Sequence, residues 1–212
     1  MIFMKNFMLM ASMLMASLCA SAQDIALPAP DFNEKTTTVI EALRTRHSVR
    51  SFDQAPLSTQ QLSNLCWAAF GMSRDANHRT APTAMNRQEI RLFLFNADGV
   101  YEYDAQGNVL KKKASGDQRS LIAAKQTFVL DAPVSLLIVI DFDKYGSSDE
   151  RAVRMTCVDA GNVSENINLY CQAAGLATVP RATMDIEGIR SLLGFNEKQL
   201  PIINNPVGKE KK

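Results

Sequence analysis

The stretch that decides the fold of this chain begins with VSLLIVI, residues 134–140, and continues with ERAVRMTCVDAGNVSENINLYCQAAG, residues 150–175. The first run is apolar almost throughout, as a strand covered on both faces requires. In the second run, apolar and small residues repeat at alternating steps of four and three, which predicts a helix over about 149–174 ended by Gly175. Small residues in this repeat, such as Ala160, let two backbones approach closely. The seam is therefore expected to lie at a helix–helix interface.

Three shorter helices are predicted around this pair. Residues 36–46 carry apolar side chains at helical spacing. A second helix begins at Ser58, whose side chain is spaced to form a capping box with Gln61, and Gly71 ends it. A third is expected over residues 185–193.

The remaining regular segments are predicted strands. Their apolar and aromatic residues alternate or cluster between turn signals such as Asp98-Gly99. They are residues 91–96, residues 100–104, a short strand ending in the lysines 111–113, and residues 176–180. With an extended tail at the C-terminus, these elements predict one α+β domain over residues 31–212.

The composition excludes several classes of protein. The chain has 212 residues, with 23 Lys and Arg against 22 Asp and Glu. A non-specific nucleic-acid binder needs clustered positive charge, so this balance argues against one. Hydrophobic residues make up 46% of the chain and charged residues 21%, which argues against intrinsic disorder.

The N-terminus reads as a secretory signal peptide. A single Lys5 precedes an apolar run from Phe7 to Cys19, and Ala20-Ser21-Ala22 forms a small-x-small cleavage site. The run is shorter than the roughly 20 apolar residues that a membrane-spanning helix needs. We therefore expect residues 1–22 to be removed, the rest to be exported to the periplasm or the exterior, and no stable membrane span to remain.

Few residues could bind a metal or form a disulfide. After cleavage the chain would keep Cys66, Cys157 and Cys171, and Cys157 and Cys171 are too far apart on one helix to bridge. Buried free cysteines are the simpler interpretation. No C-x-x-C pair occurs and the chain has only two histidines, so no metal site is expected.

Four segments carry chemistry outside the predicted core. Two arginines and a hydroxyl follow the first helix, a proline-braced loop carries amides, a strand end could aim backbone N–H groups at a ligand, and the tail is basic. The first, second and fourth have ordinary alternatives: a helix end, a connector and a solvated tail. The segments are RHSVR at 46–50, RTAPTAMNRQ at 79–88, TVPRAT at 178–183 and NPVGKEKK at 205–212.

Together, in this order, the segments resemble the nitroreductase family of FMN-dependent enzymes. The resemblance covers nearly all of the chain after residue 22. It is carried by RHSVRSF at 46–52, RTAPTAMNRQ at 79–88, APVSLLIVI at 132–140, DAGNVSENINLYCQAAGLATVP at 159–180, LLG at 192–194 and PVGK at 206–209. It implies an α+β fold with a central, mostly antiparallel sheet flanked by helices, in an intertwined homodimer whose interface would include the seam of the long helix.

The resemblance also implies a role for each segment in FMN binding. The first would hold the flavin phosphate, ribityl chain and ring edge, and the second would come from the other subunit. The third would line the reactive edge of the ring, with a backbone N–H toward its reactive nitrogen, and the tail would contact the phosphate. The residues implied are Arg46, His47, Ser48 and Arg50; Pro82, Thr83, Ala84 and Asn86; Pro180, Arg181, Ala182 and Thr183; and Lys209 and Lys211.

The activity implied is two-electron reduction of nitroaromatic or quinone-like electrophiles by ping-pong flavin chemistry. NAD(P)H is the candidate electron donor and a small molecule the acceptor, and no protein side chain is expected to be catalytic because the flavin carries the chemistry. Two alternatives stay open: an exported flavin dehydrogenase of the azoline-oxidising type, and a flavin-binding protein without turnover.

Overall fold

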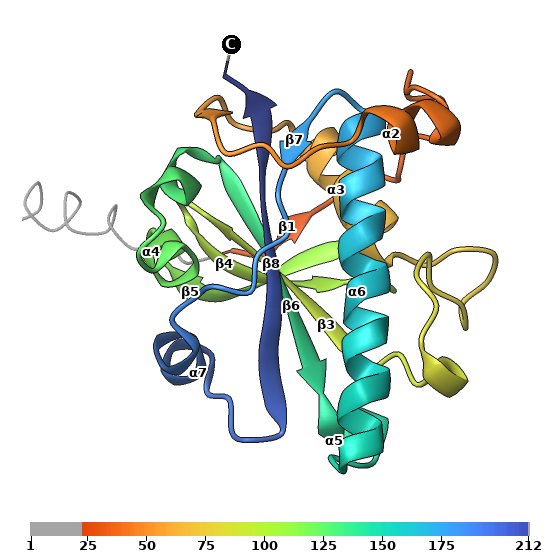
Figure 1. Cartoon of the computed structure of the whole chain (residues 1–212), viewed down its shortest axis with the longest axis vertical. Coiled ribbons are helices and arrows are strands. Elements are labelled where there is room, and N and C mark those ends of the chain that lie inside the picture. The colour runs from red at the N-terminus through yellow and green to blue at the C-terminus, as the bar shows by residue number, and fades with distance from the viewer. Residues whose placement is uncertain (1–22, 212) are drawn as a thin grey trace, which may run out of the picture.

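The predicted buried strand is β6, Val134–Asp141, and all of its residues are buried. It lies inside the sheet of a computed structural model that describes residues 23–211 (Figure 1). The predicted signal peptide, residues 1–22, lies outside the described residues.

The sheet is antiparallel at every pairing, in the order β1-β5-β4-β3-β6-β8-β2, and β7 pairs with β8. The other strands are β1 (Ile25–Ala26), β2 (Phe52–Asp53), β3 (Ile90–Asn96), β4 (Gly99–Asp104), β5 (Val109–Ser115), β7 (Ala177–Thr178) and β8 (Gln199–Glu210).

Helices cover both faces of this sheet. The α-helices are α2 (Val39–Thr45), α3 (Thr59–Phe70), α4 (Arg119–Ala123), α5 (Phe142–Tyr145), α6 (Glu150–Ala173) and α7 (Ile186–Leu193), and the 3₁₀ turns are η1 (Ala84–Asn86) and η2 (Thr127–Asp131). The central antiparallel sheet flanked by helices confirms the predicted α+β fold.

Alternation along β3 separates the two cores. Leu92 and Leu94 face α3 and α6, whereas Phe93 and Phe95 face α4 and α7. Because successive side chains of a strand point to opposite faces, a sheet with both faces covered needs apolar residues at every position. The sequence of β3 meets this requirement at its centre.

Helix boundaries follow the predicted caps. Ser58 accepts from the Gln61 N–H and the Gln61 side chain accepts from the Ser58 N–H, so the predicted capping box is formed. The long helix begins after Asp149, whose side chain accepts from the Ala152 N–H. Gly175 follows with a φ of 69°.

Two expectations are corrected by the fold. The C-terminal tail, expected to be merely extended, forms the twelve-residue strand β8 between β6 and β2. The seam of the long helix was expected at a subunit interface, but Ala160 and Ser164 are buried within the protomer. Ser164 Oγ donates to Asn205 Oδ1 of β8 at 3.0 Å. The seam therefore packs α6 on its own sheet and α3.

The first prediction follows from that burial. Replacing Ala160 with Trp inserts a large ring where no space exists and should destabilise the protomer itself by about 3 kcal/mol or more. This corresponds to a fall of roughly 5–10 °C in melting temperature for a chain of this size. Arg154→Trp, on the exposed side of the same helix, is the control and should melt close to wild type. Equal melting temperatures for both variants would contradict the packing of this seam.

Candidate functional site

The C-terminal end of β8 gathers the first segment and the tail. The chain after α2 runs antiparallel to this end, with Phe52 opposite Glu210 and Asp53 opposite Lys209. The Lys211 N–H donates to the Ser51 carbonyl at 3.1 Å. Residues 51–53 and 209–211, distant in the sequence, therefore lie side by side at one end of the molecule, and residues 46–50 lead directly into this pairing.

The third segment joins them through β7. Thr178 is opposite Val207 on β8, and its carbonyl accepts from the Val49 N–H at 3.0 Å. On the same strand, Gly208 lets Pro133 pack closely, because a Cβ there would lie 2.7 Å from Pro133 Cδ. The first, third and fourth segments thus converge on β8.

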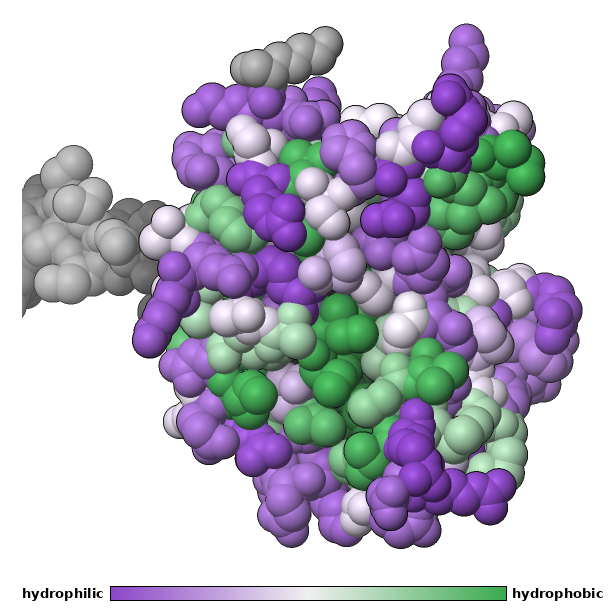
Figure 2. Space-filling view, in the orientation of Figure 1, coloured by the Kyte–Doolittle hydropathy of each residue, from purple (hydrophilic) through white to green (hydrophobic). Residues whose placement is uncertain are grey.

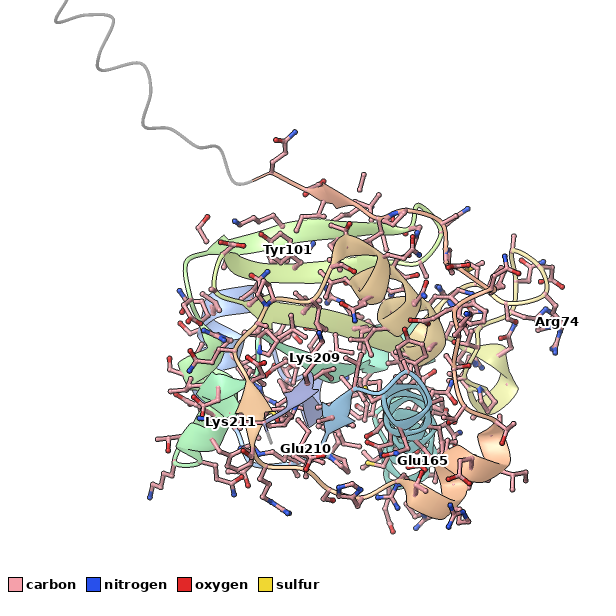
Figure 3. All side chains as sticks on the ribbon, turned by 90° about the horizontal axis from the view of Figure 1, so that it is seen from above. Arg74, Tyr101, Glu165, Lys209, Glu210 and Lys211 are labelled. Atoms are coloured by element: carbon pink, nitrogen blue, oxygen red, sulfur yellow. The ribbon has the colours of Figure 1, made fainter. Side chains whose placement is uncertain are left out.

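Unpaired positive charge collects at this convergence. The exposed cations Arg46, Arg50, Lys209 and Lys211 form no ion pair with any carboxylate in residues 23–211. His47 and Ser48 between the arginines are also exposed. Figure 3, which looks down on this end, shows Lys209 and Lys211 around the end of β8.

Two amides of α6, which the sequence analysis missed, belong to the same site. Asn168 and Gln172 line a shallow depression together with Arg46, His47 and Pro180. They lie four residues apart, so they share one face of the last helical turns. This spacing, just before the third segment, was the available signal, but it needed the helix to be placed beside Arg46.

The four residues of the third segment do not face the surface equally. The Arg181 side chain is buried and bonds Asn204 Oδ1 at 2.6 Å and Gln126 Oε1 at 2.8 Å, besides two carbonyls at the end of α4. Its backbone N–H donates to Asn204. Pro180, Ala182 and Thr183 are exposed, and the last two have N–H groups that donate to no acceptor in the described part of the chain. The free backbone donors are therefore those of Ala182 and Thr183.

The second segment lies elsewhere. Its Ala84 N–H donates to Asp159 Oδ2 at 2.8 Å, halfway along α6. Asp159 and Gln172 are thirteen residues apart on one helix, which is about 20 Å. In Figure 3, Arg74, which lines a pocket with residues of this segment, lies on the far side of α6 from Lys209. One protomer thus separates the second segment from the other three.

The second segment is a strained, partly exposed loop. Met85 and Asn86 have positive φ values of 54° and 53°. The Asn86 amide donates to the Asn77 carbonyl at 2.9 Å and accepts from the Gln88 amide at 3.0 Å. Pro82 is exposed, Thr83 and Ala84 are half-buried, and the Met85 side chain is 70% exposed. This conformation presents an apolar side chain outward.

Comparison with known proteins decides the family. The sequence model of the Nitroreductase family matches residues 43–209. The chain belongs to the nitroreductase family. It is 31% identical to a "putative nitroreductase" of Ralstonia eutropha JMP134 of known structure, covering 91% of this chain and 92% of that one, with a TM-score of 0.83. It is 27% identical over 194 residues to "Putative nitroreductase MJ1384" of Methanocaldococcus jannaschii, covering 85% and 94% of the two chains.

A more distant likeness concerns the fold alone. One chain of the Escherichia coli microcin synthetase McbBCD complex superposes with a TM-score of 0.67 at 20% identity, covering 93% of this chain and 82% of that one.

Members of the nitroreductase family are oxidoreductases that typically use a flavin with NAD(P)H, and this chain is an oxidoreductase.

Reactive thiols, metal sites or membrane-spanning helices in the described residues would indicate other functions. Cys66, Cys157 and Cys171 are free, and Cys66 and Cys171 are buried as predicted, whereas Cys157 is half-buried. Burial raises the pKa of the Cys66 thiol to about 12, so it stays protonated. Between residues 23 and 211, no group of three His, Cys, Asp or Glu side chains is placed to hold a metal ion. Over the same residues no helix combines the length and apolarity needed to cross a membrane.

A buried carboxylate pair supports the loop of the second segment. Glu89, at the base of the loop, is fully buried, and neither of its carboxylate oxygens accepts a hydrogen bond within the described residues. Burial, and to a smaller extent the neighbouring Asp159, raise the pKa of Glu89 to about 7. A proton held between the two carboxyl groups would let Asp159 keep its bond to the Ala84 N–H.

The second prediction is a pH dependence. Because the pKa of Glu89 is higher in the folded than in the unfolded chain, its contribution to stability is present at acidic pH and is lost as the pH rises through about 7. Glu89→Gln supplies a neutral donor to Asp159. It should melt near wild type at pH 5 and a few degrees higher at pH 8, on the order of 1–3 kcal/mol. The exposed Glu187→Gln is the control. A Glu89→Gln variant no more stable than wild type at pH 8 would contradict the shared proton.

Proposed function

We propose that this protein is an FMN-dependent oxidoreductase that reduces small nitroaromatic or quinone-like electrophiles in two-electron steps. The observation that carries the proposal is the arrangement of donors along β8: four unpaired cations gather toward its C-terminal end, and two free backbone N–H groups lie on the turn bonded to its middle residue Asn204. This donor set fits a phosphorylated flavin, which carries a dianionic phosphate and a ring edge that accepts hydrogen bonds.

The cations would hold the phosphate. Arg46 and Arg50 lie in the segment between α2 and β2, and Lys209 and Lys211 lie two residues apart at the end of β8. Because strand residues two apart point the same way, both lysines can face one ligand while Glu210 faces away. Arginine and lysine side chains that form no ion pair within the described residues keep their charge free for an anion.

The backbone would position the ring. The N–H groups of Ala182 and Thr183 are donors fixed on an exposed turn, and Arg181, buried beneath it, bonds the turn to Asn204 of β8. Donors held in place stabilise negative charge without reorganising. Bound FMN would supply the hydride chemistry, and the side chains around it would orient it and the electrophile.

A second copy of the chain would complete the site. Pro82, Thr83, Ala84 and Asn86 lie about 20 Å from the depression beside Arg46 in their own protomer. Large apolar side chains of α2 and α6 are exposed, with Ile40 at 74% and Val158 at 60%. Figure 2 shows hydrophobic surface over α2 and between α7 and α6. A homodimer would cover these residues and bring the second segment to the partner's flavin.

Export from the cytoplasm would determine which electron donor the enzyme can use. If residues 1–22 act as a signal peptide, the mature enzyme works outside the cytoplasm, where NAD(P)H is not expected. We therefore propose NAD(P)H as the donor in vitro and a different reductant at the site of action. The superposition on a microcin synthetase chain is compatible with the alternative, an azoline-type dehydrogenase, at the level of the fold.

Absorbance of the purified mature protein tests the proposed activity. The oxidised flavin spectrum should bleach on anaerobic addition of NADH and return on addition of a nitroaromatic compound or a quinone. A yellow protein would instead support flavin binding without turnover if NADH does not reduce its flavin and if, after reduction with dithionite, none of these acceptors reoxidises it. A colourless protein that takes up no FMN would contradict the proposal.

The third prediction addresses the phosphate contacts. The double variant Arg46→Ala, Arg50→Ala removes two charge-assisted contacts of roughly 1.5–3 kcal/mol each, so FMN affinity should fall by at least about a hundredfold. Melting temperature should change little, because both side chains are exposed. Arg151→Ala with Arg154→Ala removes two exposed arginines of α6 and should keep flavin. Full flavin occupancy in the first double variant would refute the phosphate assignment.

The fourth prediction addresses the dimer. Ile40→Asp with Leu43→Asp places two charges in the exposed apolar face of α2. In a two-fold dimer each change acts twice, so the variant should elute as a monomer, with its protomer fold kept and its flavin lost. Glu41→Asp, on the same helix, should remain a dimer. Wild-type protein that is monomeric and fully loaded with flavin would rule out the composite site.

A further inference from the structure

The sheet opens between β3 and β4 at the end away from their hairpin. The two strands pair from Asn96 opposite Gly99 to Phe93 opposite Glu102, and the ladder then stops. Both strands continue, β3 back to Ile90 and β4 on to Asp104. A cavity of about 290 Å³ lies between the unpaired ends.

The opening is framed by paired strands. Along the edge that faces away from β4, β3 stays paired with β6 as far as Ile90 opposite Ile140. β4 stays paired with β5 as far as Asp104 opposite Val109. Because each strand is bonded to a neighbour on its other side, the gap is not the frayed end of a hairpin. The backbone edges that would have paired with each other face the cavity instead.

The cavity carries an excess of positive charge. Two carboxylates line it, Glu102 and Asp104, and each is already paired within 2.8 Å. The cationic side chains that line it are Arg79, Arg91, Lys111, Lys113 and Lys144. Arg91 and Lys113 pair with Glu102, and Lys111 pairs with Asp104. Arg79 and Lys144 are left without a carboxylate partner in residues 23–211.

Arg79 is the stronger indication of a ligand, because its guanidinium is half-buried. Its Nε donates to Gln88 Oε1 at 2.9 Å, and its guanidinium carbon lies 5.0 Å from the centre of the Phe70 ring. One terminal nitrogen reaches only the Phe70 carbonyl, at 3.5 Å, and the other has no partner in the described chain. Burial lowers the pKa of this arginine, so its charge costs free energy that a bound anion would offset.

We infer that this cavity binds a small dianion carrying carboxylate or phosphate groups, between Arg79 and Lys144. Its volume is near the lower limit for ligand pockets, which suits a compact molecule of a few carbon atoms or an inorganic ion. The site is separate from the cations at β8 and does not depend on the proposed flavin chemistry. Arg79 begins the loop that carries Pro82 to Asn86, so the anion would lie at the base of that loop.

Titration calorimetry on the purified protein tests the inference with three probes at matched ionic strength. Succinate represents an extended dianion, inorganic phosphate a compact one, and succinamide is a neutral molecule of the shape of succinate. At least one dianion should bind with a dissociation constant in the low millimolar range or below. Succinamide should bind at least about tenfold more weakly, because charge-assisted contacts are lost.

Single substitutions test whether the dianion binds between Arg79 and Lys144. Arg79→Gln and Lys144→Gln should each weaken the dianion by about tenfold or more, and Lys125→Gln, an exposed lysine elsewhere, should not. Lys144 is exposed on α5, so its variant tests the site even if Arg79→Gln folds poorly. Three results would overturn the inference: no binding of either dianion at 10 mM or so, equal binding of succinamide, or affinity that survives Lys144→Gln but is lost with Arg46→Ala and Arg50→Ala.

Discussion

The antiparallel pairing of β8 with its neighbours is the constraint on which the site depends. β8 lies between β6 and β2 and also pairs with β7, so its last residues meet segments from three parts of the chain. Asn204 and Asn205 are fully buried and tie the strand to Arg181 and to Ser164. Buried polar groups that are fully bonded specify one arrangement of neighbours. The positions of Lys209 and Lys211 follow directly from this strand, and the segment of Arg46 and Arg50 is tied to it through β2 and β7.

The second constraint is the length of α6. Its C-terminal turns supply Asn168 and Gln172 to the depression beside Arg46, whereas its middle holds the loop of the second segment through Asp159. A straight helix keeps these two places about 20 Å apart. One protomer therefore carries the two parts of the proposed site at separate places, and the exposed apolar residues of α2 and α6 are the surface that we propose a second copy covers. The composite site and the dimer are one proposal.

Local sequence signals predicted where the helices and strands lie better than they predicted what each one packs against. The apolar run of β6 and the capping box at Ser58 were sufficient to place those elements. The small-residue seam predicted close packing correctly but not its partner, since spacing cannot distinguish the chain's own sheet from another subunit. β8 was missed as a strand because Pro201 and Pro206 are poor strand signals, and its register shifts beside Pro201. Arg181 was assigned to the site by resemblance, but burial of its side chain is a property of the tertiary structure alone.

The central claim, that one site is built from two copies, is tested most directly by mixing two defective chains. One carries Arg46→Ala and Arg50→Ala, and the other carries Pro82→Trp, a bulky change at an exposed position of the second segment. Each homodimer should lack FMN. After co-refolding in equal amounts, about half of the dimers should be mixed and have one intact site each, restoring about a quarter of wild-type flavin occupancy. No recovery in mixed dimers that are shown to form would contradict a site shared between the two chains.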